Sequence, residues 1–106
     1  MHAAQDYIDA HLGTHFSFEQ LASQFNVSYR HLARLFRDNT GQTLQSYLRT
    51  QRIDLARELL RSSHLNAEQI AERCGYGSSH AFRLAWRQEM PQPPLQFRHA
   101  LAYEGA

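Results

Sequence analysis

The chain contains an internal repeat, and this repeat limits the folds open to it more than any other feature. Residues 17–22, SFEQLA, return 49 positions later as residues 66–71, NAEQIA. One extra residue then enters the second copy, so that Phe36 matches Trp86 at an offset of 50. Each copy has the pattern of a short capped helix, a tight turn and a second helix with one apolar and one basic stripe. This pattern predicts two helix-turn-helix units in tandem.

Caps and apolar spacing predict seven helices, and no segment shows the alternation of a strand. Ser17 and Asn66 each begin a capping box with a glutamine three residues later. Ser28 is placed to cap the second helix of the first unit, and Gly41 to end it. The expected helices span about residues 3–12, 18–25, 29–40, 44–62, 67–74, 79–90 and 94–101.

The longest periodic stretch, about residues 44–62, predicts a helix that joins the two units. A helix of about 19 residues rises about 28 Å, and DNA repeats its major groove on the same side every ~34 Å. The stretch is therefore about long enough to hold two groove-binding helices one helical turn apart. We expect an all-α fold of seven helices, with helix-turn-helix lobes at 1–42 and 64–106 and a linker helix at 43–63.

Positive charge is concentrated in the middle of the chain, although the net charge is only +1. Residues 1–27 carry −3, residues 28–61 carry +4, and residues 62–106 are balanced. Apart from His, every basic residue is Arg. A guanidinium can bind guanine O6 and N7, or a phosphate, through two hydrogen bonds. The pattern favours a nucleic-acid partner; the alternative explanation of the Arg excess is a genome rich in GC.

Membrane, metal and catalytic functions find no support in the sequence. No apolar run approaches the roughly 20 residues of a membrane span, and the N-terminus does not resemble a signal peptide. We therefore expect a cytoplasmic, nucleoid-associated protein. The seven His and one Cys lack the spacing of a zinc site, and no catalytic grouping is present, so we expect no metal, no cofactor and no enzymatic activity.

Further motifs run in a fixed order through residues 21–98, about three quarters of the chain. In the first half these are Leu21-Ala22, Val27-Ser28, Leu32-x-Arg34-x-Phe36, Thr40-Gly41, Tyr47-Leu48, Arg52-Ile53, Ala56 and Leu59-Leu60. In the second half they are Ile70-Ala71, Gly75-Tyr76, Phe82, Trp86 and Pro94-x-x-Phe97-Arg98. This series resembles the DNA-binding domain of the AraC/XylS family of bacterial transcription regulators.

The resemblance implies that the second helix of each lobe enters adjacent major grooves of one asymmetric promoter site in double-stranded DNA. It also implies an activator that recruits RNA polymerase. Family members often attach such a module after a ligand-sensing or dimerising domain, so we expect a C-terminal fragment whose effector and dimer contacts lie outside the chain. Four positions depart from the family pattern: Pro91 stands where Gly is usual, His80 and Ala81 stand where Ser and an aromatic residue are common, and Leu84 stands where Arg is common.

The outward face of each second helix supplies the candidate DNA contacts. Arg30 and Arg34 lie four residues apart on the face opposite Leu32 and Phe36, which suits two side chains entering one groove. We expect base contacts from Arg30, Arg34, Ser79, His80 and Arg83. Phosphate contacts, which position the protein without identifying bases, are expected from Tyr29, His31, Arg37, Arg87 and Arg98. The alternative for every one of these residues is a solvated helix face.

Four arginines of the linker helix are expected to have structural roles. Arg52 is expected to make a bond between the lobes. The other three, Arg49, Arg57 and Arg61, are expected to pair within their helix with Asp54 or Glu58.

Two other functions compete with transcription regulation. One is a helical protein-interaction module that does not bind DNA, which salt dependence of binding would distinguish. The other is a DNA-repair alkyltransferase, because some of these enzymes carry a domain of this type and Cys74 is a candidate methyl acceptor. Cys74 matches Phe25 of the first copy, however, and is therefore expected to be buried and unreactive.

Overall fold

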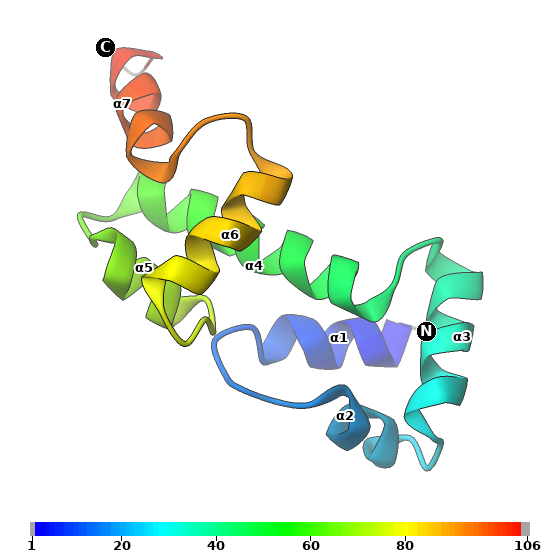
Figure 1. The fold of residues 1–106 in the computed structure, drawn as a ribbon. Helices are drawn as coiled ribbons and strands as arrows, with labels where there is room; N and C mark the ends of the chain where they lie inside the picture. The colour runs from blue at the N-terminus through cyan, green and yellow to red at the C-terminus, as the bar shows by residue number, and fades with distance from the viewer. Residues whose placement is uncertain (1, 105–106) are drawn as a thin grey trace.

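The repeat folds into two similar halves that share one long helix (Figure 1). The computed structural model describes residues 2–104, and within them it contains seven helices and no strand. The helices are α1 (His2–Ala10), α2 (Phe18–Gln24), α3 (Tyr29–Thr40), α4 (Leu44–Ser62), α5 (Ala67–Arg73), α6 (Ser79–Glu89) and α7 (Pro94–Glu104). The expected all-α class is confirmed. α1 ends two residues before the expected Leu12, and α7 continues past the expected Leu101.

Both copies begin with the same capping box. The backbone N–H of Gln20 donates to Ser17 Oγ at 3.1 Å, and Ser17 N–H donates to Gln20 Oε1 at 3.2 Å. Asn66 and Gln69 form the same reciprocal pair, with both distances 2.9 Å. Each box satisfies backbone donors that a helix start leaves free. The first helix of each unit therefore begins at the position that the repeat predicts.

Both units also turn in the same way. Asn26 and Gly75, which match in the repeat, have φ values of 57° and 86°. Glycine adopts this left-handed conformation without a steric penalty, and asparagine tolerates it better than most residues. Serines then start the second helices, because Ser28 Oγ and Ser78 Oγ each accept a backbone hydrogen bond at 3.1 Å. The turn and the cap fix the direction of α3 and α6.

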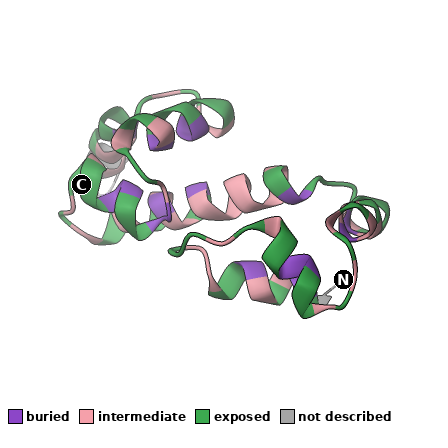
Figure 2. Ribbon diagram, turned by 60° about the horizontal axis from the view of Figure 1, so that its bottom comes forward, coloured by how far each residue is buried: buried purple, intermediate pink, exposed green. Residues whose placement is uncertain are grey.

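Two hydrophobic cores lie at opposite ends of α4 (Figure 2). The N-terminal core consists of Ala4, Ile8, Leu21, Ala22, Leu32, Phe36 and Leu44. The C-terminal core consists of Ile53, Ala56, Leu60, Ile70, Ala71, Cys74, Phe82, Ala85 and Trp86. We call the helices around each core the N-terminal lobe (α1 to α3) and the C-terminal lobe (α5 to α7). α4 contributes buried residues to both cores, which joins the lobes physically.

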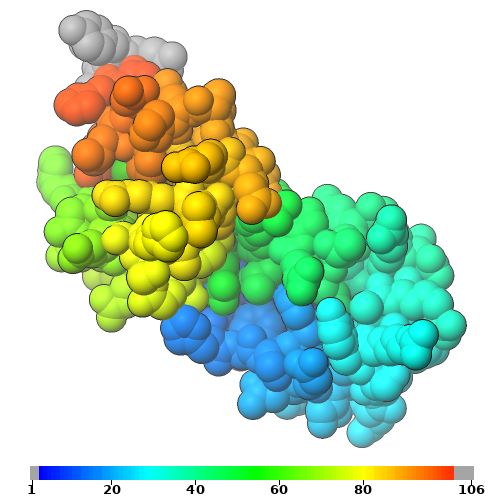
Figure 3. All heavy atoms as spheres, in the orientation of Figure 1, coloured from blue at the N-terminus to red at the C-terminus, as the bar shows by residue number. Residues whose placement is uncertain are grey.

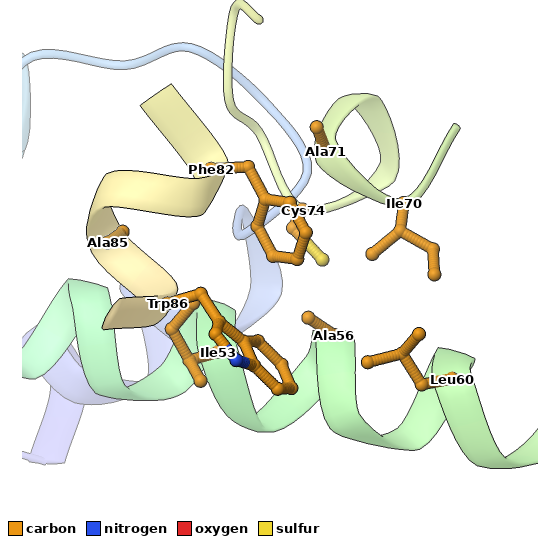
Figure 4. Close-up of a cluster of buried hydrophobic side chains, with 9 residues drawn as sticks. All are labelled: Ile53, Ala56, Leu60, Ile70, Ala71, Cys74, Phe82, Ala85 and Trp86. Carbon is orange, nitrogen blue, oxygen red and sulfur yellow. The ribbon is translucent and has the colours of Figure 1, made fainter. Parts of the chain in front are cut away.

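The two second helices, α3 and α6, lie toward opposite ends of α4 (Figure 1). The molecule measures 49 × 24 × 20 Å, and α3 (cyan) and α6 (yellow to orange) are separated by α4 (green) in Figure 3. Within the C-terminal core, the side chains of Phe82 and Cys74 point toward α4, and Ile70 faces Leu60 (Figure 4). Trp86 Nε1 donates to the carbonyl of Gln92 at 2.6 Å. This bond ties the end of α6 to the loop before α7.

Arg52 connects the lobes, as the sequence predicts. Its Nε donates to the Leu12 carbonyl at 3.1 Å, and its Nη2 donates to the Thr14 carbonyl at 3.0 Å. The guanidinium carbon lies 5.3 Å from the ring centroid of Tyr76, within cation–π range. One side chain of α4 thus contacts the loop after α1 and the turn after α5. We call Arg52, Leu12, Thr14, Gly75 and Tyr76 the lobe junction.

The ion pairs of α4 differ in one respect from the expectation. Arg57 pairs with Asp54 at 3.0 Å and Arg61 with Glu58 at 3.1 Å, both within the helix, as predicted. Arg49 instead pairs with Glu89 of α6 at 3.0 Å. The prediction for Arg49 was wrong because Asp54 lies five residues away, beyond the three- or four-residue spacing at which helix neighbours meet.

Removing the Phe82 ring should open a cavity in the C-terminal core. Phe82 is 0% exposed, so Phe82→Ala is expected to lower the free energy of unfolding by about 3–5 kcal/mol, measured by urea denaturation. Leu84→Ala, on the exposed side of the same helix, is the matched control and should change it by less than about 0.5 kcal/mol. Equal effects of the two substitutions would refute this core.

Two glycines with positive φ allow a test of the lobe junction. A Cβ on Gly41 (φ +76°) meets nothing within 4 Å, so Gly41→Ala should cost only the conformational strain of about 1–2 kcal/mol. A Cβ on Gly75 (φ +86°) would overlap the Leu12 carbonyl oxygen and lie 2.8 Å from Arg52 Nη2. Gly75→Ala should therefore lower the free energy of unfolding by about 1–3 kcal/mol more than Gly41→Ala. Thermal or urea denaturation measures the difference, and no difference would mean that the junction is loose.

Candidate nucleic-acid interface

The side of α3 opposite its core carries three arginines. Leu32 and Phe36 are buried against the N-terminal core at 2% and 0% exposure. Residues two positions from a buried residue lie about 200° around the helix, so the residue between these two points directly outward. That residue is Arg34, and it is exposed. Arg30 and Arg37 are also exposed and lie one turn before and after it. The three guanidinium groups form a basic stripe along α3.

Four residues at the start of α3 surround a hollow of about 420 Å³: Ser28, Arg30, His31 and Arg34. Arg34 Nη2 donates to His31 Nδ1 at 3.1 Å, which requires that this ring nitrogen carries no proton. The bond orients the Arg34 side chain along the helix. The structure therefore brings together both expected base-contacting residues of the N-terminal lobe, with one expected phosphate-contacting residue beside them.

Tyr29 lies at the edge of this stripe and also packs. It is half-buried, and its ring stacks on Phe18 of α2 with centroids 6.1 Å apart and an interplanar angle of 22°. A ring fixed in this way has a defined direction. The contact with α2 thus restricts the orientation of the Tyr29 side chain.

The corresponding side of α6 has a different chemistry. Phe82 and Trp86 are buried, while His80, Arg83 and Arg87 are exposed, and Ser79 at the first position of the helix is half-buried. Arg83 and Arg87 line a hollow of about 260 Å³ together with the loop at residues 90–94 and Trp86. His80, Arg83 and Arg87 therefore lie at exposed positions of α6, whereas Ser79 lies at the start of the helix on the side of its buried residues.

Arg98 has a structural role that the sequence analysis did not foresee. Its Nε donates to the Leu60 carbonyl at 3.1 Å and its Nη2 donates to the Ser63 carbonyl at 3.2 Å. Carbonyl groups at the end of a helix lack hydrogen-bond donors within the helix. Arg98 provides donors to two such carbonyls at the end of α4. The guanidinium that was expected to contact phosphate therefore bonds α7 to the end of α4. Sequence alone could not reveal this, since backbone carbonyls are present everywhere.

Cys74 is packed inside the C-terminal core. It is 0% exposed, and burial raises the pKa of its thiol to about 12, with Arg52 lowering it by a smaller amount. A nucleophilic cysteine requires a lowered pKa and access to substrate. The environment of Cys74 has the opposite character, which argues against the alkyltransferase alternative.

The Cys74 thiol should react slowly while the protein is folded. At pH 8 the native chain is expected to react with Ellman's reagent at least about a hundredfold more slowly than the chain unfolded in guanidinium chloride, because the raised pKa leaves almost no thiolate and the core excludes the reagent. Absorbance at fixed reagent concentration measures both rates. Similar rates would show that the thiol is accessible in the native state.

Across residues 2–104, none of the helices combines the length and apolar character that crossing a bilayer requires. The same part of the chain holds no group of three or more His, Cys, Asp or Glu residues arranged to bind a metal ion.

The geometry and the comparisons with known proteins agree on the class of protein. Residues 21–100 match a family described as a helix-turn-helix domain. The transcriptional activator RhaS of Klebsiella pneumoniae (strain 342) is 37% identical over 92 residues, which cover 87% of this chain and 33% of RhaS. RhaS of Salmonella schwarzengrund (strain CVM19633) gives the same identity and coverage. The chain spans about a third of the length of the curated relatives it matches.

Solved structures with the same fold include DNA-binding domains. The DNA-binding domain of AdpA, solved with a target DNA, superposes with a TM-score of 0.92 at 31% identity and covers 97% of this chain and 93% of that one. The C-terminal domain of the response regulator AraT from Geobacillus stearothermophilus has a TM-score of 0.90 at 33% identity, covering 93% and 83%. The chain is a helix-turn-helix domain. It belongs to the AraC/XylS family and corresponds to the DNA-binding domain of that family.

Proposed function

We propose that this domain binds an asymmetric promoter site by placing α3 and α6 in two successive major-groove segments of one duplex. The observation that carries the proposal is the repeated geometry of these helices. Each follows the same turn and serine cap, each buries an aromatic residue on one side, and each exposes arginine on the other. A helix with this exposed face fits the major groove, where base edges differ in their donors and acceptors.

Base contacts in the first segment are assigned to Arg30 and Arg34. Both line the hollow on α3, and a guanidinium can donate two hydrogen bonds to guanine O6 and N7. In the second segment we assign base contacts to Ser79, His80 and Arg83 at the start of α6. Serine and histidine can each donate or accept, so they suit several base edges.

Phosphate contacts are assigned to residues at the edges of the same faces. Arg37 and Arg87 lie one turn beyond the base-contacting residues on their helices, and both are exposed. Tyr29 and His31 lie at the start of α3, where helix N–H groups also favour phosphate. Arg98 is left out of this set because its guanidinium binds the end of α4.

The length of α4, which joins the two helix-turn-helix units, is compatible with simultaneous docking. α4 has 19 residues, which corresponds to a rise of about 28 Å, against ~34 Å for one turn of DNA. The lobe junction fixes α4 against both lobes through Arg52. The AdpA domain, which has the same fold, was solved with a target DNA. A connecting helix of this length suits two groove segments on one side of the duplex.

We further propose that the domain activates transcription by contacting RNA polymerase, as part of a regulator with the organisation of its relatives. The support is the similarity to RhaS, which is described as a transcriptional activator. Transcription from a promoter that contains the selected site should increase when the domain is added to purified polymerase. Unchanged or reduced transcription would contradict this part of the proposal.

Selection of bound oligonucleotides from a random pool, followed by footprinting, tests the docking directly. We expect two protected groove segments on one side of the duplex, about one helical turn apart, with different sequences. Protection of a single segment would contradict the use of both helices.

Arg34→Ala is expected to weaken binding to the selected site by about 1–3 kcal/mol and to relax base preference at one position. Affinities for sites with each base at each position measure both effects. Arg61→Ala is the matched control, since it removes the same charge from an exposed residue that pairs with Glu58 on α4. A loss that is uniform over all site sequences would instead identify Arg34 as a phosphate contact.

Salt dependence separates DNA binding from the protein-interaction alternative. The logarithm of the association constant should fall by about 0.9 per log unit of salt for each phosphate neutralised. Arg37→Ala should reduce this slope by about one contact while leaving base preference unchanged. Titrations between low and physiological salt measure the slope. Affinity for DNA that is independent of salt would refute the proposed phosphate contacts.

A further inference from the structure

Leu84 occupies the place on α6 that Arg34 occupies on α3. At the offset of 50 that aligns the second helices, Leu32 and Phe36 match Phe82 and Trp86, and the residue midway between each pair is Arg34 in one copy and Leu84 in the other. Each midway residue lies about 200° around its helix from both buried neighbours. The two side chains therefore point outward from equivalent positions.

The structure leaves Leu84 in solvent. Its exposed fraction is 45%, and of the side chains that the structure describes, it is one of two large apolar residues that are exposed. It belongs to neither hydrophobic core. His80 lies one turn before it and Arg87 one turn after it, and both are exposed. An apolar side chain thus interrupts the polar stripe at the centre of the face that α6 presents.

We propose that Leu84 contacts the 5-methyl group of a thymine in the major-groove segment bound by α6. The inference rests on the proposed docking of α6 and adds the base that its central residue selects. If α6 docks as α3 does, Leu84 faces the base edges that Arg34 faces in the other segment.

The chemistry of the groove leaves one base group for leucine. Guanine and adenine present hydrogen-bonding groups along the major-groove edge and cytosine presents an amino group beside a C5–H, whereas thymine presents a methyl group at C5. Leucine can donate and accept nothing, so it would leave a guanine O6 or N7 without a partner, at a cost in free energy. Contact with the thymine methyl instead removes apolar surface of both partners from water.

The neighbouring residues keep their assigned roles. Arg83 lies about 100° around α6 from Leu84 and so contacts a different part of the groove. The two lobes then recognise different sequences with one scaffold: Arg34 selects guanine in one segment, and Leu84 selects thymine in the other. This difference also accounts for the asymmetry proposed for the site.

Deoxyuridine substitution tests the contact, because deoxyuridine differs from thymidine only by the missing methyl group. Each thymine of the selected site is replaced in turn, and the affinities of the natural chain and of Leu84→Ala are measured. We expect one position in the α6 segment at which the natural chain binds about fourfold more weakly, equivalent to about 0.8 kcal/mol for one buried methyl group. Leu84→Ala should bind both versions equally there. Deoxyuridine in the α3 segment is the control and should affect both proteins alike.

A second variant, Leu84→Arg, tests whether the residue at this position determines which base is preferred. By analogy with Arg34, it should shift the preference at the same position from thymine toward guanine, measured with sites that differ only at that base pair. A melting curve matching that of the natural chain shows that each variant is folded.

Two negative results have different meanings. If footprinting shows both segments protected but no thymine in the α6 segment depends on Leu84, or the selected segment contains no thymine, then the role of Leu84 is wrong and the docking of α6 stands. If the α6 segment is not protected at all, the proposed docking itself fails, and this inference fails with it.

Discussion

The two lobes are held against each other by one guanidinium that contacts parts of both. Arg52 projects from α4, donates to the carbonyls of Leu12 and Thr14, and lies over the ring of Tyr76. These partners belong to a loop of the N-terminal lobe and a turn of the C-terminal lobe. Without this contact, the lobes would be joined mainly through α4, and the orientation of α6 relative to α3 would depend on how far that helix bends.

Local signals made most of the fold predictable from sequence. Ser17, Asn66 and Ser28 identify helix starts because a side chain and a backbone group only three residues apart must meet. Gly41 identifies a helix end for a similar reason. The partners of Arg49 and Arg98 were not predictable, since Glu89 is 40 residues from Arg49 and Arg98 bonds to backbone carbonyls. Contacts of that kind depend on the packing of whole helices.

The sequence could predict which face of each helix carries the candidate site. Burial of Leu32 and Phe82 determines which side of α3 and of α6 points outward. Knowing the face does not identify the atoms that an exposed arginine binds. The position of Arg34 beside His31 became visible only in the structure, as did the packing of Tyr29 on Phe18.

The sharing of α4 between both cores couples the folding of the two halves. Leu44 is buried in one core, and Ile53, Ala56 and Leu60 are buried in the other, all on one continuous helix. Loss of either core would expose apolar residues of α4 and weaken the surface on which the other core packs. The domain should therefore unfold in a single cooperative transition. A destabilising change in one lobe should then also lower the stability of the lobe at the other end of α4.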